Sequence, residues 1–105
     1  QELTVLRKEL PDVMSGFAKI AQAATKNAAL AKKTKELIAL GLAVAARCDG
    51  CIGFHAKTLR ELGASKAEVA ETLGMAIYMG GGPSVMYAAD AMQAFLEFTN
   101  TPDNQ

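Results

Sequence analysis

The sequence is short of the residues with which proteins bind nucleic acids. It has no tryptophan, and its aromatic side chains are four phenylalanines and two tyrosines among 105 residues. It therefore offers few surfaces on which bases can stack. It also has no excess of positive charge, because 11 basic and 11 acidic side chains give a formal net charge of zero. Nucleic-acid binders usually carry a basic patch or stripe, so we expect no nucleic-acid partner.

Long hydrophobic runs and export signals are also missing. A membrane span needs roughly 18 or more consecutive apolar residues, and no stretch of the sequence approaches that length. The first ten residues, QELTVLRKEL, are charged and amphipathic, unlike a secretory signal. We therefore expect no membrane partner and a cytoplasmic location. In that reducing compartment, a Cys-x-x-Cys pair is more often catalytic or metal-binding than a structural cross-link.

Strand signals are absent, whereas helical spacing of apolar residues runs along most of the chain. We predict one all-α domain over residues 1–105, a compact bundle of five to six helices, because chains of this length seldom divide. No strand precedes a Gly-x-Gly-x-x-Gly segment, so no nicotinamide or flavin cofactor is indicated, and we expect no cofactor. The predicted helices cover residues 11–24, about 30–46, 49–62, 65–79 and 83–96, followed by a frayed tail at 100–105.

Several helix ends can be read directly from the sequence. Gly63 is a typical residue for ending a helix. Ser65 and Glu68 have the spacing of a capping box, in which each side chain satisfies a free backbone amide at the start of the next helix. Residues 80–82 are three consecutive glycines, which predict a turn with closely approaching backbones. Pro83 then suits the first position of the last helix.

Two stretches of the predicted helices contain no charged residue: LIALGLAVAA, residues 37–46, and MAIYMGGGPSVMYAA, residues 75–89. Helices that are apolar all round are buried in a core or an interface. A domain of this size cannot bury every helix face within one chain. One interpretation is a tight core of small residues, and the other is a large self-association surface. We favour the second and predict a homo-oligomer in which residues 75–89 contribute to the contact between copies.

The segment RCDGCIGFH, residues 47–55, holds both cysteines and the single histidine of the chain. If a helix begins near Asp49, Cys48 lies at its mouth and Cys51 in its first turn, where the helix dipole favours a thiolate. His55 follows Cys51 by four residues, so the two share one helix face and His55 can accept the thiol proton. Cys48 is close enough to Cys51 for a disulfide.

The spacing of this cluster leaves three interpretations open. The first is a redox-active pair with a nucleophile, a base and a second thiol. The second is a metal site, for which Cys48, Cys51 and His55 supply three ligands and Glu36 could supply a fourth. The third is a pair of inert cysteines in a core. A thioredoxin-like fold is disfavoured, because it also needs strands.

Glu36 is open to two interpretations of its own. It could be a surface partner of Lys32 or Lys33, which precede it by four and three residues on the same helix. It could also be an acid–base group aimed at His55. If the two helices are antiparallel about Asp49, we expect an axial offset of a few ångströms between Glu36 and His55. An interaction between the two side chains would then require a bridging water or tilted helices.

The pattern Glu-x11-Cys-x2-Cys-x3-His, followed by a Gly-Gly-Pro segment, resembles the alkyl hydroperoxidase D-like group of the carboxymuconolactone decarboxylase family. The resemblance covers about residues 30–98 and implies an all-α domain that assembles into trimers or hexamers. The family's peroxidases have a further histidine immediately before the second cysteine, and here that position is Gly50. Its lactone decarboxylases lack the dithiol, so Cys48 and Cys51 argue against that activity, which remains the alternative together with a metal-binding or redox-sensing module.

The resemblance also implies a thiol peroxidase site with assigned roles. The residue matching Cys51 attacks the hydroperoxide, and the residue matching Cys48 resolves the product to a disulfide. His55 and Glu36 match the proton relay that activates the nucleophile. The implied partners are a hydroperoxide substrate and a dithiol reductant, such as a lipoyl group. The spacing and the resemblance agree on Cys51, because it is the cysteine four residues from His55.

Overall fold

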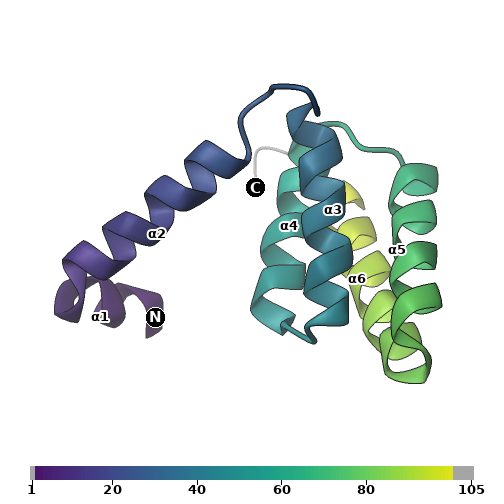
Figure 1. The fold of residues 1–105 in the computed structure, drawn as a ribbon. Coiled ribbons are helices and arrows are strands. Elements are labelled where there is room, and N and C mark those ends of the chain that lie inside the picture. Colours follow the sequence, from purple (N-terminus) through teal and green to yellow (C-terminus); the bar gives the residue numbers. More distant parts are fainter. Residues whose placement is uncertain (1, 101–105) are drawn as a thin grey trace. The chain divides into compact units, whose positions relative to one another are not determined.

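The structure, a computed structural model, describes residues 2–100 of the chain and the side chains of residues 3–98. Residues 2–100 contain helices and no strand, so the predicted all-α class is confirmed. The helices, drawn in Figure 1, are α1 (Glu2–Glu9), α2 (Pro11–Ala24), α3 (Lys32–Ala45), α4 (Asp49–Glu61), α5 (Lys66–Gly80) and α6 (Gly82–Asn100). The helix α1 was not among the predicted helices. Of the predicted frayed tail, Asn100 ends α6, and residues 101–105 lie outside the described part.

The chain divides between Lys32 and Lys33 into two compact units. The first unit contains α1 and α2, which pack against each other. As predicted, α2 begins with Pro11, whose fixed φ suits the first turn of a helix. It ends at Thr25, whose hydroxyl and backbone N–H both bond to the carbonyl of Ala21. The apolar stripe of α2 stays on the surface: Val13, Phe17 and Ile20 are exposed, and none of its residues is buried.

The second unit contains α3, apart from its first residue Lys32, and α4 to α6, and α6 packs against both α4 and α5. Figure 1 shows α4 and α5 on either side of α3, with α6 behind them. Every helix of this unit contributes three residues to one buried cluster, and five of the twelve are alanines, which allow the helices to approach closely. The cluster consists of Leu40, Ala43, Val44, Ile52, Ala56, Leu59, Val69, Leu73, Ala76, Ala88, Ala91 and Phe95.

The connections after α4 form as the sequence predicts. Gly63 takes a positive φ of 78° at the end of α4. The Glu68 backbone N–H donates to the Ser65 hydroxyl at 3.0 Å, and the Ser65 N–H donates to the Glu68 carboxylate at 2.9 Å, which completes the capping box of α5. At the turn into α6, Gly81 has a φ of 73°, and a Cβ on Gly80 would collide with the side chain of Ser84. These glycines therefore permit the predicted close turn.

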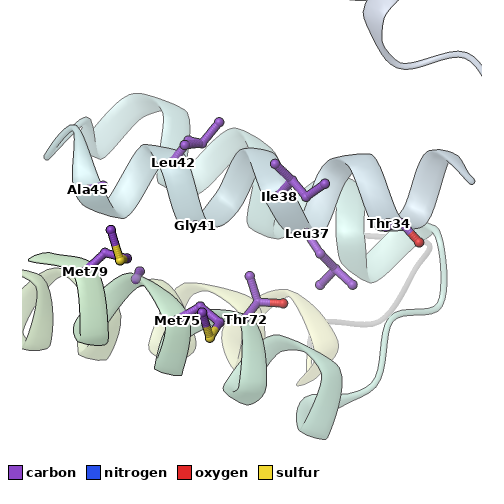
Figure 2. Close-up of a pocket in the computed structure, with 10 residues that line it drawn as sticks. Thr34, Leu37, Ile38, Gly41, Leu42, Ala45, Thr72, Met75 and Met79 are labelled. Carbon is purple, nitrogen blue, oxygen red and sulfur yellow. The ribbon is translucent and has the colours of Figure 1, made fainter. Parts of the chain in front are cut away.

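The two uncharged stretches are partly core and partly surface. An apolar groove of about 420 Å³ runs between them, with α3 along one wall and α5 along the other (Figure 2). Its walls carry no charged side chain, and they consist of Thr34, Leu37, Ile38, Gly41, Leu42, Ala45, Thr72, Met75, Ala76 and Met79. Leu42, Met75 and Met79 are each more than 60% exposed. None of the described helices is long and apolar enough to cross a lipid bilayer.

Candidate active site

The connection between α3 and α4 places the cysteines. At the end of α3, the backbone N–H of Cys48 bonds to the carbonyl of Ala43 at 3.0 Å, and that of Arg47 bonds to Val44 at 3.1 Å. These two bonds are those of a Schellman motif, which needs a left-handed residue. Arg47 fills this position with a φ of 58°, uncommon for a residue other than glycine. The chain thereby turns sharply and starts α4 two residues later.

Cys48 and Cys51 occupy the predicted positions at the start of α4. Cys48 is the N-cap residue, and its Sγ accepts a hydrogen bond from the backbone N–H of Cys51 at 3.2 Å. The two sulfur atoms are joined in a disulfide, with Cα atoms 5.2 Å apart. Cys51 is exposed and Cys48 is half-buried. The second cysteine therefore faces solvent in the first turn of the helix, where the dipole favours negative charge.

Glu36 and His55 form a direct hydrogen bond between α3 and α4. Nδ1 of His55 lies 2.6 Å from Oε1 of Glu36. Of the two routes that the predicted offset allowed, the bridging water is wrong, because the bond is direct. Glu36 lies nine residues before the end of α3 and His55 six after the start of α4, which leaves an offset of about 4.5 Å. The side chains of Glu36 and His55 span that offset in a direct hydrogen bond.

The surface interpretation of Glu36 is also wrong. Glu36 is only 3% exposed, although it is a carboxylate. Lys33, one of the two lysines considered as its partner, instead pairs with Glu68 of α5 at 2.9 Å. A buried carboxylate needs a partner, and His55 provides it. The alternation of charged and apolar residues around Glu36 did not reveal this, because burial depends on the helices packed against α3.

The Glu36 bond determines how the histidine can act. An ionised carboxylate can only accept hydrogen bonds, so Nδ1 of His55 then carries the proton, and this N–H donates a hydrogen bond to Glu36. Nε2 is left with a lone pair, and it is the nitrogen that can take a proton from another group. The His55 side chain is 22% exposed, compared with 4% for that of Glu36. The pair thus reaches from the core of the unit to the face of α4 that carries Cys51.

Phe54 is a neighbour of this pair that was not among the predicted site residues. Its ring meets that of His55 in a T-shaped contact, with centroids 5.1 Å apart and planes at 82°. Gly50, where the resemblance leads one to expect a histidine, is exposed, and a Cβ there would meet no atom within 4 Å. His55 is the single histidine of the chain. It is therefore the imidazole available to this dithiol within one chain.

The placement of the four side chains tests the interpretation of this cluster as a metal site. Within residues 2–100, no three His, Cys, Asp or Glu side chains are arranged to hold a metal ion. The sulfurs of Cys48 and Cys51 are bonded to each other, and the Glu36 carboxylate is bonded to Nδ1 of His55. The predicted site residues thus come together as two bonded pairs, one turn apart on α4.

An all-α fold with a dithiol at a helix start and a buried Glu–His pair defines a class of small helical thiol proteins, and comparisons with known proteins identify the family. The carboxymuconolactone decarboxylase family matches residues 11–94. The chain belongs to this family, and the predicted resemblance is confirmed at that level.

Relatives of the chain come from distant organisms. An uncharacterized protein of Cupriavidus necator is 39% identical over 90% of this chain and 84% of its own length. An uncharacterized protein of Methanocaldococcus jannaschii is 30% identical over 87% of this chain and 88% of its own length. The crystal structure of an apo carboxymuconolactone decarboxylase family protein from Legionella pneumophila has 63% identity and a TM-score of 0.91, covering 94% of this chain and 88% of that one.

Proposed function

We propose that this protein is a thiol-dependent peroxidase that reduces hydroperoxides through Cys51 and Cys48. The observation that carries the proposal is the part-buried Glu36–His55 hydrogen bond, which lies one helical turn from a disulfide-linked Cys-x-x-Cys pair. A nucleophile, an adjacent base and a third group that orients the base make up the usual arrangement for activating a nucleophilic side chain.

In the reduced protein, Cys51 is the attacking thiol. His55 takes its proton at Nε2 while Glu36 holds Nδ1, and the helix start stabilises the resulting thiolate. The sulfur attacks the terminal oxygen of the hydroperoxide, so that an S–O bond forms and the O–O bond breaks. Cys51 becomes a sulfenic acid. The departing alkoxide takes the proton from His55 and leaves as an alcohol.

Cys48 then closes the disulfide. Its sulfur attacks that of Cys51, an S–S bond forms, the S–O bond breaks and water leaves with the thiol proton of Cys48. The disulfide of the structure has the bonding of this product. A dithiol reductant, for which a lipoyl group has the right chemistry, then exchanges with the exposed Cys51 sulfur and is itself oxidised to a cyclic disulfide. We place this cycle in the cytoplasm, where reduced dithiols are maintained.

The proposal is tested by following thiols and mass together. Fully reduced protein, freed of reductant, is treated with one equivalent of hydroperoxide. We expect the loss of two thiols and of two hydrogens in mass, formation of one equivalent of alcohol, and repeated turnover when dihydrolipoamide is added. Cys51→Ser is the inactive control. Protein purified without chelator that holds about one zinc per chain, with unreactive thiols, would instead identify a metal-binding module.

A further inference from the structure

Phe54 lies at the rim of the candidate active site rather than in the core. It is 65% exposed, although aromatic side chains usually contribute large buried areas to cores and interfaces. Its T-shaped contact with the His55 ring is made next to the reactive pair. An apolar ring is thus held in solvent beside the proposed base.

The helix geometry puts Phe54 on one side of Cys51 and His55 on the other. The three residues lie in the regular part of α4 (Asp49–Glu61), three and four positions apart. At about 100° per residue, Phe54 lies roughly 60° to one side of Cys51 and His55 roughly 40° to the other, each one turn further along the helix. A molecule that approaches the Cys51 sulfur from solvent therefore has an aromatic surface on one flank and the base on the other.

Gly50 leaves open space on the Phe54 side. It directly precedes Cys51, and a Cβ on it would meet no atom within 4 Å. Gly50 and Phe54 are four residues apart, so they share one face of the helix. The ring of Phe54 therefore borders bare helix backbone at Gly50. An apolar group could lie on that backbone against the ring while its hydroperoxide reaches Cys51.

We propose that Phe54 is a specificity-determining residue that favours hydroperoxides with an alkyl or aryl group over hydrogen peroxide, and this rests on the proposed peroxidase function. Contact between the ring and the apolar group removes apolar surface of both from water, which hydrogen peroxide cannot do. The group leaves as the alcohol after the O–O bond breaks, so it can be exchanged at each turnover. The same contact allows the product alcohol to compete with the substrate.

The test compares two oxidants on the same variants. Second-order rates of thiol loss are measured with cumene hydroperoxide and with hydrogen peroxide for the unaltered protein, Phe54→Ala, Phe54→Leu and Phe54→Trp. Phe17→Ala is the matched control, because Phe17 is a phenylalanine of similar exposure, 67%, on α2. Inhibition of the cumene hydroperoxide reaction by cumyl alcohol is measured alongside, and light scattering reports the assembly state of each variant.

We expect Phe54→Ala to lower the rate with cumene hydroperoxide by about five- to tenfold, at the low end for a hydrophobic contact, and to change the rate with hydrogen peroxide by less than about twofold. The ratio of the rate with cumene hydroperoxide to the rate with hydrogen peroxide should be as high in Phe54→Trp as in the unaltered protein, and intermediate in Phe54→Leu. Cumyl alcohol should no longer inhibit Phe54→Ala. Phe17→Ala should leave both rates unchanged.

Four outcomes overturn the proposal. If Phe54→Ala lowers the rates with both oxidants equally and shifts the pH profile of the rate, Phe54 is a residue that positions His55. Unchanged rates, or a changed assembly state in Phe54→Ala, would make it a surface or interface residue. In each of these cases the peroxidase function stands. If neither oxidant removes thiols from the unaltered protein, the peroxidase function fails as well, and the Phe54 proposal fails with it.

Discussion

His55 Nδ1 and Glu36 Oε1 lie 2.6 Å apart, and this bond joins α4 to α3. Glu36 is the single charged side chain among the buried residues of the described part, where Ser84 is the other polar one. Burying a carboxylate is costly unless it is paired. The hydrogen bond to His55 offsets the cost of burying the Glu36 carboxylate. The same bond orients the imidazole ring of His55.

Our first prediction concerns this bond. Glu36→Gln keeps the size of the side chain and a hydrogen-bond acceptor, but it removes the negative charge that stabilises a protonated His55. We expect the rate of Cys51 oxidation to fall by about 10²-fold, at the low end for general-base catalysis. Stopped-flow measurement of thiol loss checks it. Glu68→Gln, the same change on α5, should leave the rate unaltered. An equal rate in Glu36→Gln would show that Glu36 acts only in folding.

The second prediction concerns the division of labour between the thiols. Cys51 shares a helix face with His55, whereas Cys48 is the N-cap residue seven positions away. In Cys48→Ser treated with one equivalent of peroxide and a sulfenic-acid trap, mass spectrometry should show the adduct on Cys51. Cys51→Ser should give very little. His55→Ala should slow the first step by about 10²- to 10⁴-fold. An adduct on Cys48 alone would reverse the roles.

The third prediction concerns self-association. The groove between α3 and α5 is lined without charge, and Met75 and Met79 are 61% and 76% exposed in it. We expect a second copy of the chain to cover this surface in a trimer or hexamer, and light scattering of the unaltered protein should report that mass. Met75→Glu should shift the mass toward the monomer, because the new charge would be buried in the interface.

Controls for the third prediction come from the same helix. Ala70→Glu introduces the same charge at an exposed position outside the groove, and the assembly should persist. Ala76 is unsuited to the test, because it is only 7% exposed and a charge there would unfold the unit. A monomer at micromolar concentration in the unaltered protein would contradict the prediction.

The fourth prediction concerns the pH dependence of stability at the start of α5. The pKa of Glu68 is lowered from its ordinary value of 4.5, first by the hydrogen bond from the Ser65 backbone N–H and then by Lys33. A lowered folded-state pKa means that Glu68 stabilises the fold above its unfolded pKa, and that this contribution is lost as the pH falls through the folded-state value. Below about pH 4.5, the melting temperature should therefore fall more steeply in the unaltered protein than in Glu68→Gln.

The control for the fourth prediction is Glu71→Gln, which neutralises an exposed carboxylate in the next turn of α5. It should keep the steep acid response of the unaltered protein. Melting curves followed by circular dichroism at several pH values make the comparison. If the melting temperatures of the unaltered protein and of Glu68→Gln fall in parallel down to acid pH, the Glu68 carboxylate contributes nothing to the pH dependence of stability.

Helix ends were predictable because their signals are local. Gly63 ends a helix through its own backbone freedom, and the capping box of Ser65 and Glu68 needs only four consecutive residues. Pro11 likewise begins α2 through its fixed φ. The helix α1 was missed because its eight residues are mostly polar and carry no cap that the sequence identifies. The exposure of Phe17 could not be predicted either, since its spacing matches that of a core-facing residue.

The sequence by itself determined that this protein is helical, where most helices begin and end, and that Cys48, Cys51 and His55 share the start of one helix. These properties depend on residues within a few positions of each other, so spacing reveals them. Only the tertiary structure decided that Glu36 is buried and bonded to Nδ1 of His55, because that contact joins residues 19 positions apart on two helices. The Glu36–His55 bond forms only when α3 and α4 pack together, and that packing depends on the whole buried cluster of α3 to α6.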